Sequence, residues 1–205
     1  MKGVGAAKVV RTWKWRSVAT ATAALGMLLP AATAEGATYW TIKPDVRDPL
    51  LWVGLGPPTT DPLGQATATA VLAVPTANAR DQHWRIYRSG VGYKIANRQS
   101  GQCLYGLPDR GPVSAPTMVL PCQSRLFGTG RYSNRFNFHV PGRGQIIRVL
   151  SPGTYLLRYA VRRGEDELFG RCLSVPVFQV GVRPELRPCT RGTKNQKFVL
   201  KSFTD

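Results

Sequence analysis

The sequence is poor in acidic residues, histidine and cysteine. Only 11 of its 205 residues are Asp or Glu, two are His and four are Cys. No Cys-x-x-Cys pair occurs, so zinc binding and thiol redox chemistry are both disfavoured. The motifs Gly-x-Ser-x-Gly and His-Glu-x-x-His and the phosphate-binding P-loop are absent as well. We therefore predict a protein that is not an enzyme and that has no catalytic residue, cofactor or metal ligand.

A run of apolar residues long enough to cross a membrane is also lacking. The apolar stretch at residues 18–30 falls short of the ~20 residues that a span needs. Five Lys or Arg residues precede it, and the small residues Ala32-Thr33-Ala34 follow. This pattern favours a secretory signal peptide at residues 1–34 over a membrane anchor. The predicted mature protein is one secreted domain at 35–205, located extracellularly or in the periplasm.

Basic residues dominate the charge of this domain. Without the five cations of the leader it has 23 Lys and Arg against 11 acids, a net charge of +12. The arginines are scattered singly and form no block of like charge, so we expect no specific nucleic-acid binding. Two explanations of the positive charge remain: attraction to acidic groups of a cell surface, and a basic face that only aids solubility.

Glycine and proline are abundant, with 21 and 16 residues. They separate short runs such as HWRIY, RFNFHV, IIRVL and KFVLK. Short runs of this kind between turn residues favour an all-β sandwich or barrel.

A pattern of amide, spacer and aromatic residue occurs three times, always before alternating apolar residues. Residues two apart on a strand face the same side, so amide and aromatic side chain should both point inward. The aromatic would fill the core, and the amide would bond the backbone of its own copy. His83, a spacer, should then face solvent, and His139 could bond locally. The three pairs are Gln82 and Trp84, Asn134 and Phe136, and Gln196 and Phe198.

The cysteines occupy matching positions in the second and third copies. Cys103 and Cys122 are 19 residues apart, and Cys172 and Cys189 are 17 apart. Of the three possible pairings, a bridge within each copy is the most economical, and each would contribute ~3 kcal/mol in the chain-entropy model. The first copy places Trp52 and Val74 in roughly the same register. The copies span approximately residues 39–88, 91–139 and 144–201.

Three copies with Gln-x-Trp-like ends, two of which open on Cys-Leu, resemble the ricin B-type lectin-like β-trefoil. The phrases TYWTIKPDVRDPLLWVG and FNFHVPGRGQII make residues 39–200 similar to the binding subunits, A or C type, of cytolethal distending toxin. The resemblance implies an all-β protein with three pseudo-symmetric repeats.

It further implies a non-catalytic subunit that binds a glycan or lipid of the host cell surface. Its partners would be a DNase I-like nuclease subunit, which it delivers, and a second trefoil subunit. By position, Tyr39, Trp40 and Trp52 would belong to an exposed aromatic patch, and both disulfides would be structural.

Two other functions remain open on the sequence: a free-standing secreted carbohydrate-binding lectin and a polyanion binder that relies on charge. Ricin-type sugar pockets usually have an Asp just after the Cys-Leu step. Here CLYG and CLSV supply no acid, and the nearest carboxylates are Asp109 and the run Glu165-Asp166-Glu167.

Overall fold

The computed structural model describes residues 37–60, 66–76, 78–90, 92–106, 115–123, 134–142, 145–160 and 170–204. Residues 35–205 make up one compact unit of the chain. The predicted signal peptide, Asp109 and the acidic run at 165–167 lie outside the described residues. Within the described part, no helix is long and apolar enough to span a membrane.

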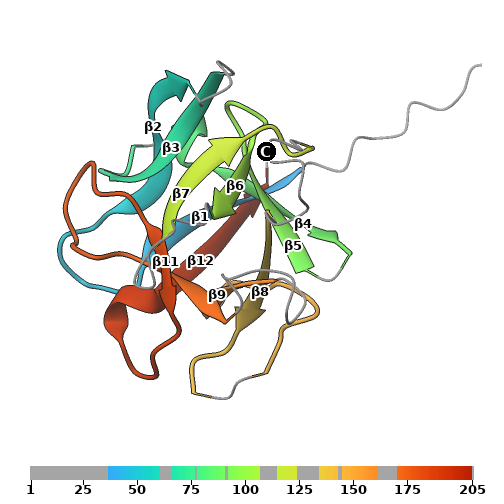
Figure 1. Ribbon diagram of the computed structural model, residues 1–205, viewed down its shortest axis with the longest axis vertical. Coiled ribbons are helices and arrows are strands. Elements are labelled where there is room, and N and C mark those ends of the chain that lie inside the picture. The colour runs from blue at the N-terminus through green and yellow to red at the C-terminus, as the bar shows by residue number, and fades with distance from the viewer. Residues whose placement is uncertain are drawn as a thin grey trace, which may run out of the picture. The chain divides into compact units, whose positions relative to one another are not determined.

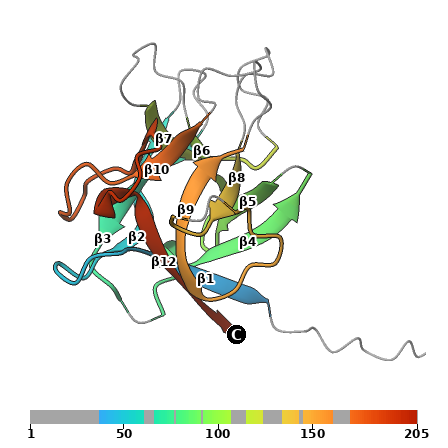
Figure 2. The same cartoon turned by 90° about the horizontal axis from the view of Figure 1, so that it is seen from below.

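Six strands pair edge to edge, all antiparallel, and close on themselves. Their order is β1–β4–β5–β8–β9–β12 and back to β1. Figures 1 and 2 show these strands around a common centre. The strands of this closed sheet are β1 (Thr38–Pro44), β4 (Trp84–Ser89), β5 (Gly92–Asn97), β8 (Arg135–His139), β9 (Gly153–Tyr159) and β12 (Lys197–Thr204).

Three hairpins complete the fold, one from each copy. Strand β7 of the second hairpin pairs with a strand of each of the other two, so the three hairpins are joined. Each copy thus contributes four strands in sequence, which is the predicted β-trefoil. The hairpins are β2 (Trp52–Thr60) with β3 (Ala66–Ala73), β6 (Cys103–Gly106) with β7 (Ala115–Leu120), and β10 (Arg171–Ser174) with β11 (Glu185–Pro188).

The aromatic residues of the three amide-x-aromatic pairs lie at the centre. Trp84, Phe136 and Phe198 are fully buried. The indole N–H of Trp84 donates a hydrogen bond of 2.8 Å to the backbone carbonyl of Val53, which ties β4 to the first hairpin. Burying such large side chains is the main favourable contribution to folding of a domain of this size.

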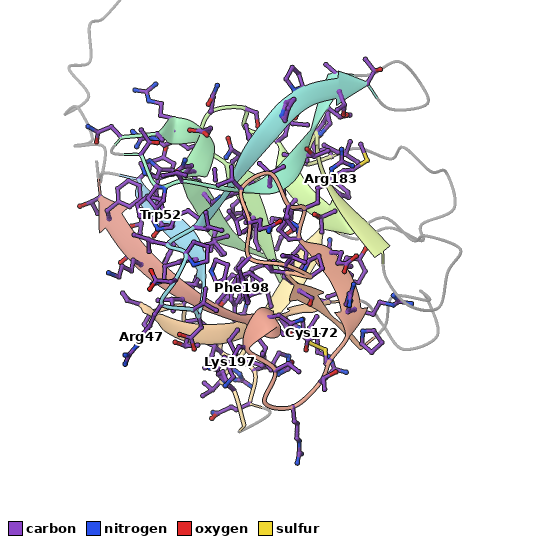
Figure 3. The ribbon with its side chains drawn as sticks, turned by 90° about the vertical axis from the view of Figure 1, so that its left-hand side faces the viewer. Arg47, Trp52, Cys172, Arg183, Lys197 and Phe198 are labelled. Carbon is purple, nitrogen blue, oxygen red and sulfur yellow. A yellow bond between two sulfur atoms is a disulfide. The ribbon has the colours of Figure 1, made fainter. Side chains whose placement is uncertain are left out.

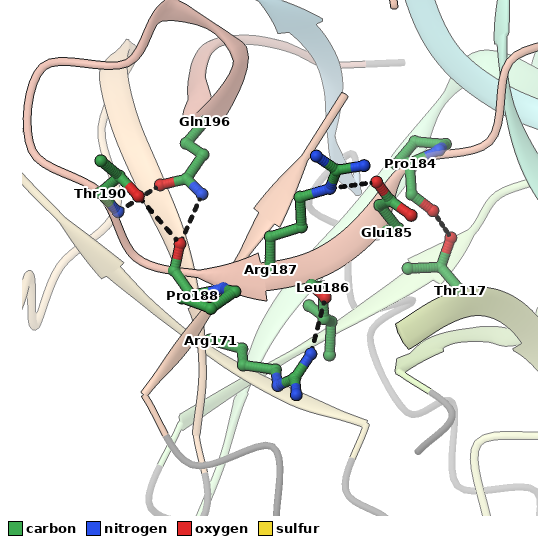
Figure 4. Close-up of polar contacts among 9 residues, drawn as sticks. All are labelled: Thr117, Arg171, Pro184, Glu185, Leu186, Arg187, Pro188, Thr190 and Gln196. Atoms are coloured by element: carbon green, nitrogen blue, oxygen red, sulfur yellow. Dashed lines mark hydrogen bonds and ion pairs between the residues drawn. The ribbon is translucent and has the colours of Figure 1, made fainter. Parts of the chain in front are cut away.

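The buried amides bond the backbone of their own copies. Gln82 lies in the 3-10 turn η1 (Arg80–Gln82), where its Nε2 donates to the carbonyl of Val74 over 2.7 Å and its Oε1 accepts from Thr76 N–H over 3.1 Å. Gln196, in η2 (Lys194–Gln196), repeats both bonds with Pro188 and Thr190, each at 2.8 Å (Figure 4). These amides satisfy backbone groups that the strands leave unpaired.

The second copy differs in its amide. Asn134 is shorter than glutamine, and its Nδ2 reaches the carbonyl of Cys122 over 2.9 Å and the hydroxyl of Tyr105 over 3.0 Å. The bond from the amide N–H to a backbone carbonyl is thus kept in this copy, and the Tyr105 hydroxyl is a further partner of the Asn134 amide.

The disulfides join Cys103 to Cys122 and Cys172 to Cys189, as the repeat predicts. The register predicted for the first copy needs a correction. Gln82 bonds Val74 where Gln196 bonds Pro188, so Val74 corresponds to Pro188. The residue in the place of Cys189 is therefore Pro75, one position further on. Trp52 pairs with Ala73 across the first hairpin, as Cys172 pairs with Arg187 across the third.

Candidate binding surfaces

The predicted aromatic patch is wrong in one of its three members. Trp40 is only 6% exposed and pairs with Trp84 across β1 and β4. Because side chains alternate along a strand, Trp40 faces the core, while its neighbour Tyr39 faces outward. Tyr39 and Trp52 are half-buried on β1 and β2, and their role in binding stays a prediction.

Tyr39 belongs to a cluster of aromatic and cationic side chains. Its ring stacks on Phe203 with centroids 6.0 Å apart, and the guanidinium carbon of Arg98 lies 4.4 Å from its ring centroid. His83 lies in the same cluster. Its ring is 4.3 Å from that of Phe203, and its Nδ1 is 3.3 Å from Nη1 of Arg98. His83 is buried, so the prediction that it faces solvent is wrong: Phe203 of the last strand covers it.

The position of the usual sugar-binding Asp is filled or closed in every copy. In the second copy it is Tyr105, which is buried and donates its hydroxyl to the carbonyl of Pro121 over 2.9 Å. In the third copy it is Ser174, which is also buried. In the first copy it is Gly54, where a Cβ atom would lie 3.0 Å from Cγ of Gln82. A carboxylate would not fit at these places without rearrangement.

A pocket of about 560 Å³ lies beside the first hairpin. Its polar lining residues include Asp81, Thr67, Ser100 and Gln102, and Pro58 adds an apolar one. The backbone carbonyl of Asp81 is fixed by Nδ2 of Asn97 over 2.7 Å. A carboxylate, a hydroxyl and an amide around one pocket suit a ligand with several hydroxyl groups.

A second pocket, of about 420 Å³, adjoins the Cys172–Cys189 disulfide. Arg158, Arg191 and His139 line it, so its charge suits an anion. Within the described residues, no group of three or more His, Cys, Asp or Glu is placed to hold a metal ion.

Four large apolar side chains stay exposed at one side of the molecule, and we call them the valine patch. They are Leu50, Val74, Val177 and Val180, with exposed fractions of 50, 59, 50 and 62%. Figure 3 looks onto this side, where the loop between β1 and β2 and the loop between β10 and β11 meet the first hairpin.

Backbone contacts bring the segments that carry the valine patch together. Gly181 donates its N–H to the carbonyl of Leu72 over 2.7 Å, which brings the segment with Val180 beside the end of β3, just before Val74. Trp52, two residues after Leu50, pairs with the last residue of β3. Monomeric proteins rarely expose contiguous apolar patches of more than a few hundred Å², and a patch of that size usually marks a site for a partner. The sequence signal for this patch is the segment VPVFQVGV, which is unusually apolar for a turn-rich segment, but the sequence alone does not predict the patch.

Comparison with known proteins supports the fold. No protein-family model matches the sequence, and no curated protein is detectably similar to it. Among solved structures, the designed threefold-symmetric protein ThreeFoil is similar at 18% identity with a TM-score of 0.52, over 82% of this chain and 98% of that chain. The ricin B-like lectin of Macrolepiota procera, solved in complex with lactose, has 10% identity and a TM-score of 0.50, over 82% and 96%.

A mosquitocidal holotoxin is also similar, at 14% identity with a TM-score of 0.51. The match covers 82% of this chain but only 17% of the holotoxin chain. At such identities the likeness concerns the fold. The protein is therefore an all-β, disulfide-bridged β-trefoil.

Proposed function

We propose that this protein is a secreted, non-catalytic binding subunit of a toxin of the cytolethal distending type. In this role it holds a DNase I-like nuclease subunit together with a second trefoil subunit, attaches to the host cell surface and promotes delivery of the nuclease. The sequence resemblance over residues 39–200 motivates the proposal. The similarity in fold to part of a holotoxin and the two disulfides, which suit an oxidising compartment, support it.

The valine patch is the observation that carries the proposal. Leu50, Val74, Val177 and Val180 expose at least half of their surfaces, and nothing in the described part of the chain covers them. A subunit that assembles with others needs such an apolar area, because the centre of a protein interface is poor in charge. We assign the patch to the nuclease partner.

Co-purification with the nuclease subunit encoded nearest to this chain tests the proposal. The wild-type chain should form a complex of fixed stoichiometry with it. Val180→Arg places a charge in the patch and should abolish the complex. Val149→Arg is the matched control, because Val149 is 81% exposed but lies in the loop between β8 and β9. No complex with the wild type, or equal binding of both variants, would contradict the assignment.

A free-standing lectin is the second candidate, favoured by the pocket at Asp81. Its carboxylate, hydroxyl and amide groups can bond sugar hydroxyls. A glycan array separates the two functions. A signal for a neutral sugar that free monosaccharide abolishes, in a protein that binds no nuclease, would favour the lectin.

A further inference from the structure

Three cations are grouped on the outer surface of β4 and β5. Arg85 on β4 is paired with Ala96 on β5. Lys94 precedes Ala96 by two residues, and Arg98 follows it by two, so both project from the same surface as Ala96. Arg98 continues the pairing beyond β5, since its N–H donates to the carbonyl of His83 over 2.8 Å.

Arg85 is thus the diagonal neighbour of both other cations. Diagonal neighbours across an antiparallel pair lie roughly 7–8 Å apart at their Cα atoms. We call Arg85, Lys94 and Arg98 the cationic triangle. Figures 1 and 2 show β4 and β5 forming one edge of the molecule, so the triangle lies on an accessible strand pair.

Aromatic rings hold two of these cations in place. The guanidinium carbon of Arg98 is 4.4 Å from the ring centroid of Tyr39, and that of Arg85 is 5.8 Å from the ring centroid of Tyr87. Tyr39 also stacks on Phe203. These contacts restrict the two guanidinium groups, which lowers the entropic cost of binding an anion. The same contacts occupy faces of the Tyr39 ring.

Carboxylates are missing from the surrounding strands. Strands β1, β4, β5 and β12 contain no Asp or Glu, as their sequences show. Lys94 donates from Nζ to the backbone carbonyl of Cys122 over 2.8 Å. Burial lowers the pKa of Lys94, and the positive charge of Arg135 lowers it further. An anion that binds here would offset this repulsion.

We propose that the cationic triangle binds the sulfate groups of a linear sulfated glycan. The triangle offers three cations from one strand pair, with no acid on β1, β4, β5 or β12, which complements a chain of repeated fixed anions. Single-stranded nucleic acid fits less well, because its bases stack on free aromatic faces and those of Tyr39 are already in contact. The disulfides also suit a compartment in which polyanions are displayed as glycans. This inference deepens the proposed function by naming the surface ligand.

Calorimetric titration of the full chain with a heparin octasaccharide tests the inference. Arg85→Glu should weaken binding by about tenfold, the scale of one charge-assisted hydrogen bond. Arg183→Glu changes the net charge equally but lies on the side shown in Figure 3, away from β4 and β5, and should change affinity by less than about twofold. Removal of sulfate from the octasaccharide should abolish binding.

Three results would overturn the inference. One is an equal loss in both variants, which would mean that only total charge matters. Another is equal or tighter binding of single-stranded DNA of matched length. The third is unchanged binding of desulfated octasaccharide.

Failure of this inference is distinguishable from failure of the proposed function. If cells stripped of sulfated glycans by heparinase still bind the protein, the triangle is not the attachment site but the delivery role stands. If the protein forms no complex with the nuclease while Arg85→Glu loses the octasaccharide, the glycan site stands alone.

Discussion

Replacing Gln196 by alanine probes whether the inward amides stabilise the three copies. Gln196 is 3% exposed, and its amide satisfies the Pro188 carbonyl and the Thr190 N–H, each at 2.8 Å (Figure 4). An unsatisfied buried polar group costs roughly 1–3 kcal/mol. Both backbone partners belong to exposed residues, and the Thr190 hydroxyl can still donate to the Pro188 carbonyl over 3.4 Å. We therefore expect each of the two backbone groups to cost about 1 kcal/mol, the lower end of this range. The free energy of unfolding should then fall by about 2 kcal/mol.

Urea unfolding measures this loss directly. The midpoint should fall without a change in slope, since the surface exposed on unfolding stays the same. Thermal unfolding should show a decrease of about 4–8 °C for a domain of this length. Gln179→Ala is the control, because Gln179 is exposed. If the Gln196 variant differs from the control by less than about 0.5 kcal/mol, the amides do not stabilise the copies.

Two further predictions follow from contacts within the folded domain. Lys94 should titrate below 10.5 in an NMR experiment on lysine Cε signals, because burial and Arg135 lower its pKa. Its charged form is disfavoured in the folded state, so stability should rise as the pH increases from the lowered pKa towards 10.5; a midpoint at or above 10.5 would contradict this. Trp84→Phe removes the indole N–H that bonds the Val53 carbonyl and should cost about 1–3 kcal/mol in urea unfolding, whereas a neutral effect would show that the carbonyl finds another partner.

The repeat could be predicted because its signal is local. In the first and third copies both the amide and the aromatic residue are buried, although Gln82 and Gln196 lie in the 3-10 turns η1 and η2 just before the strands and not on the strands themselves. The first copy has no cysteine, so its sequence does not mark the residue that corresponds to Cys122 and Cys189. The hydrogen bond from Gln82 and the pairing of Trp52 with Ala73 show that Val74 corresponds to Pro188.

The binding surfaces depend on contacts between distant segments, which a single sequence does not define. Trp40 looked like a surface aromatic, but its pairing with Trp84 turns it inward. The cationic triangle requires the pairing of β4 with β5, and the valine patch requires that residue 181 meet Leu72. The composition shows that the domain is basic, but it does not show where on the folded surface the cations lie.

Hydrogen exchange of the complex with the nuclease subunit tests the delivery role most directly. Complex formation should slow exchange in the loops at 45–51 and 176–182, which carry Leu50, Val177 and Val180 of the valine patch, and should leave exchange in β4 and β5 unchanged. Protection confined to β4 and β5, or no change at the valine patch, would contradict it.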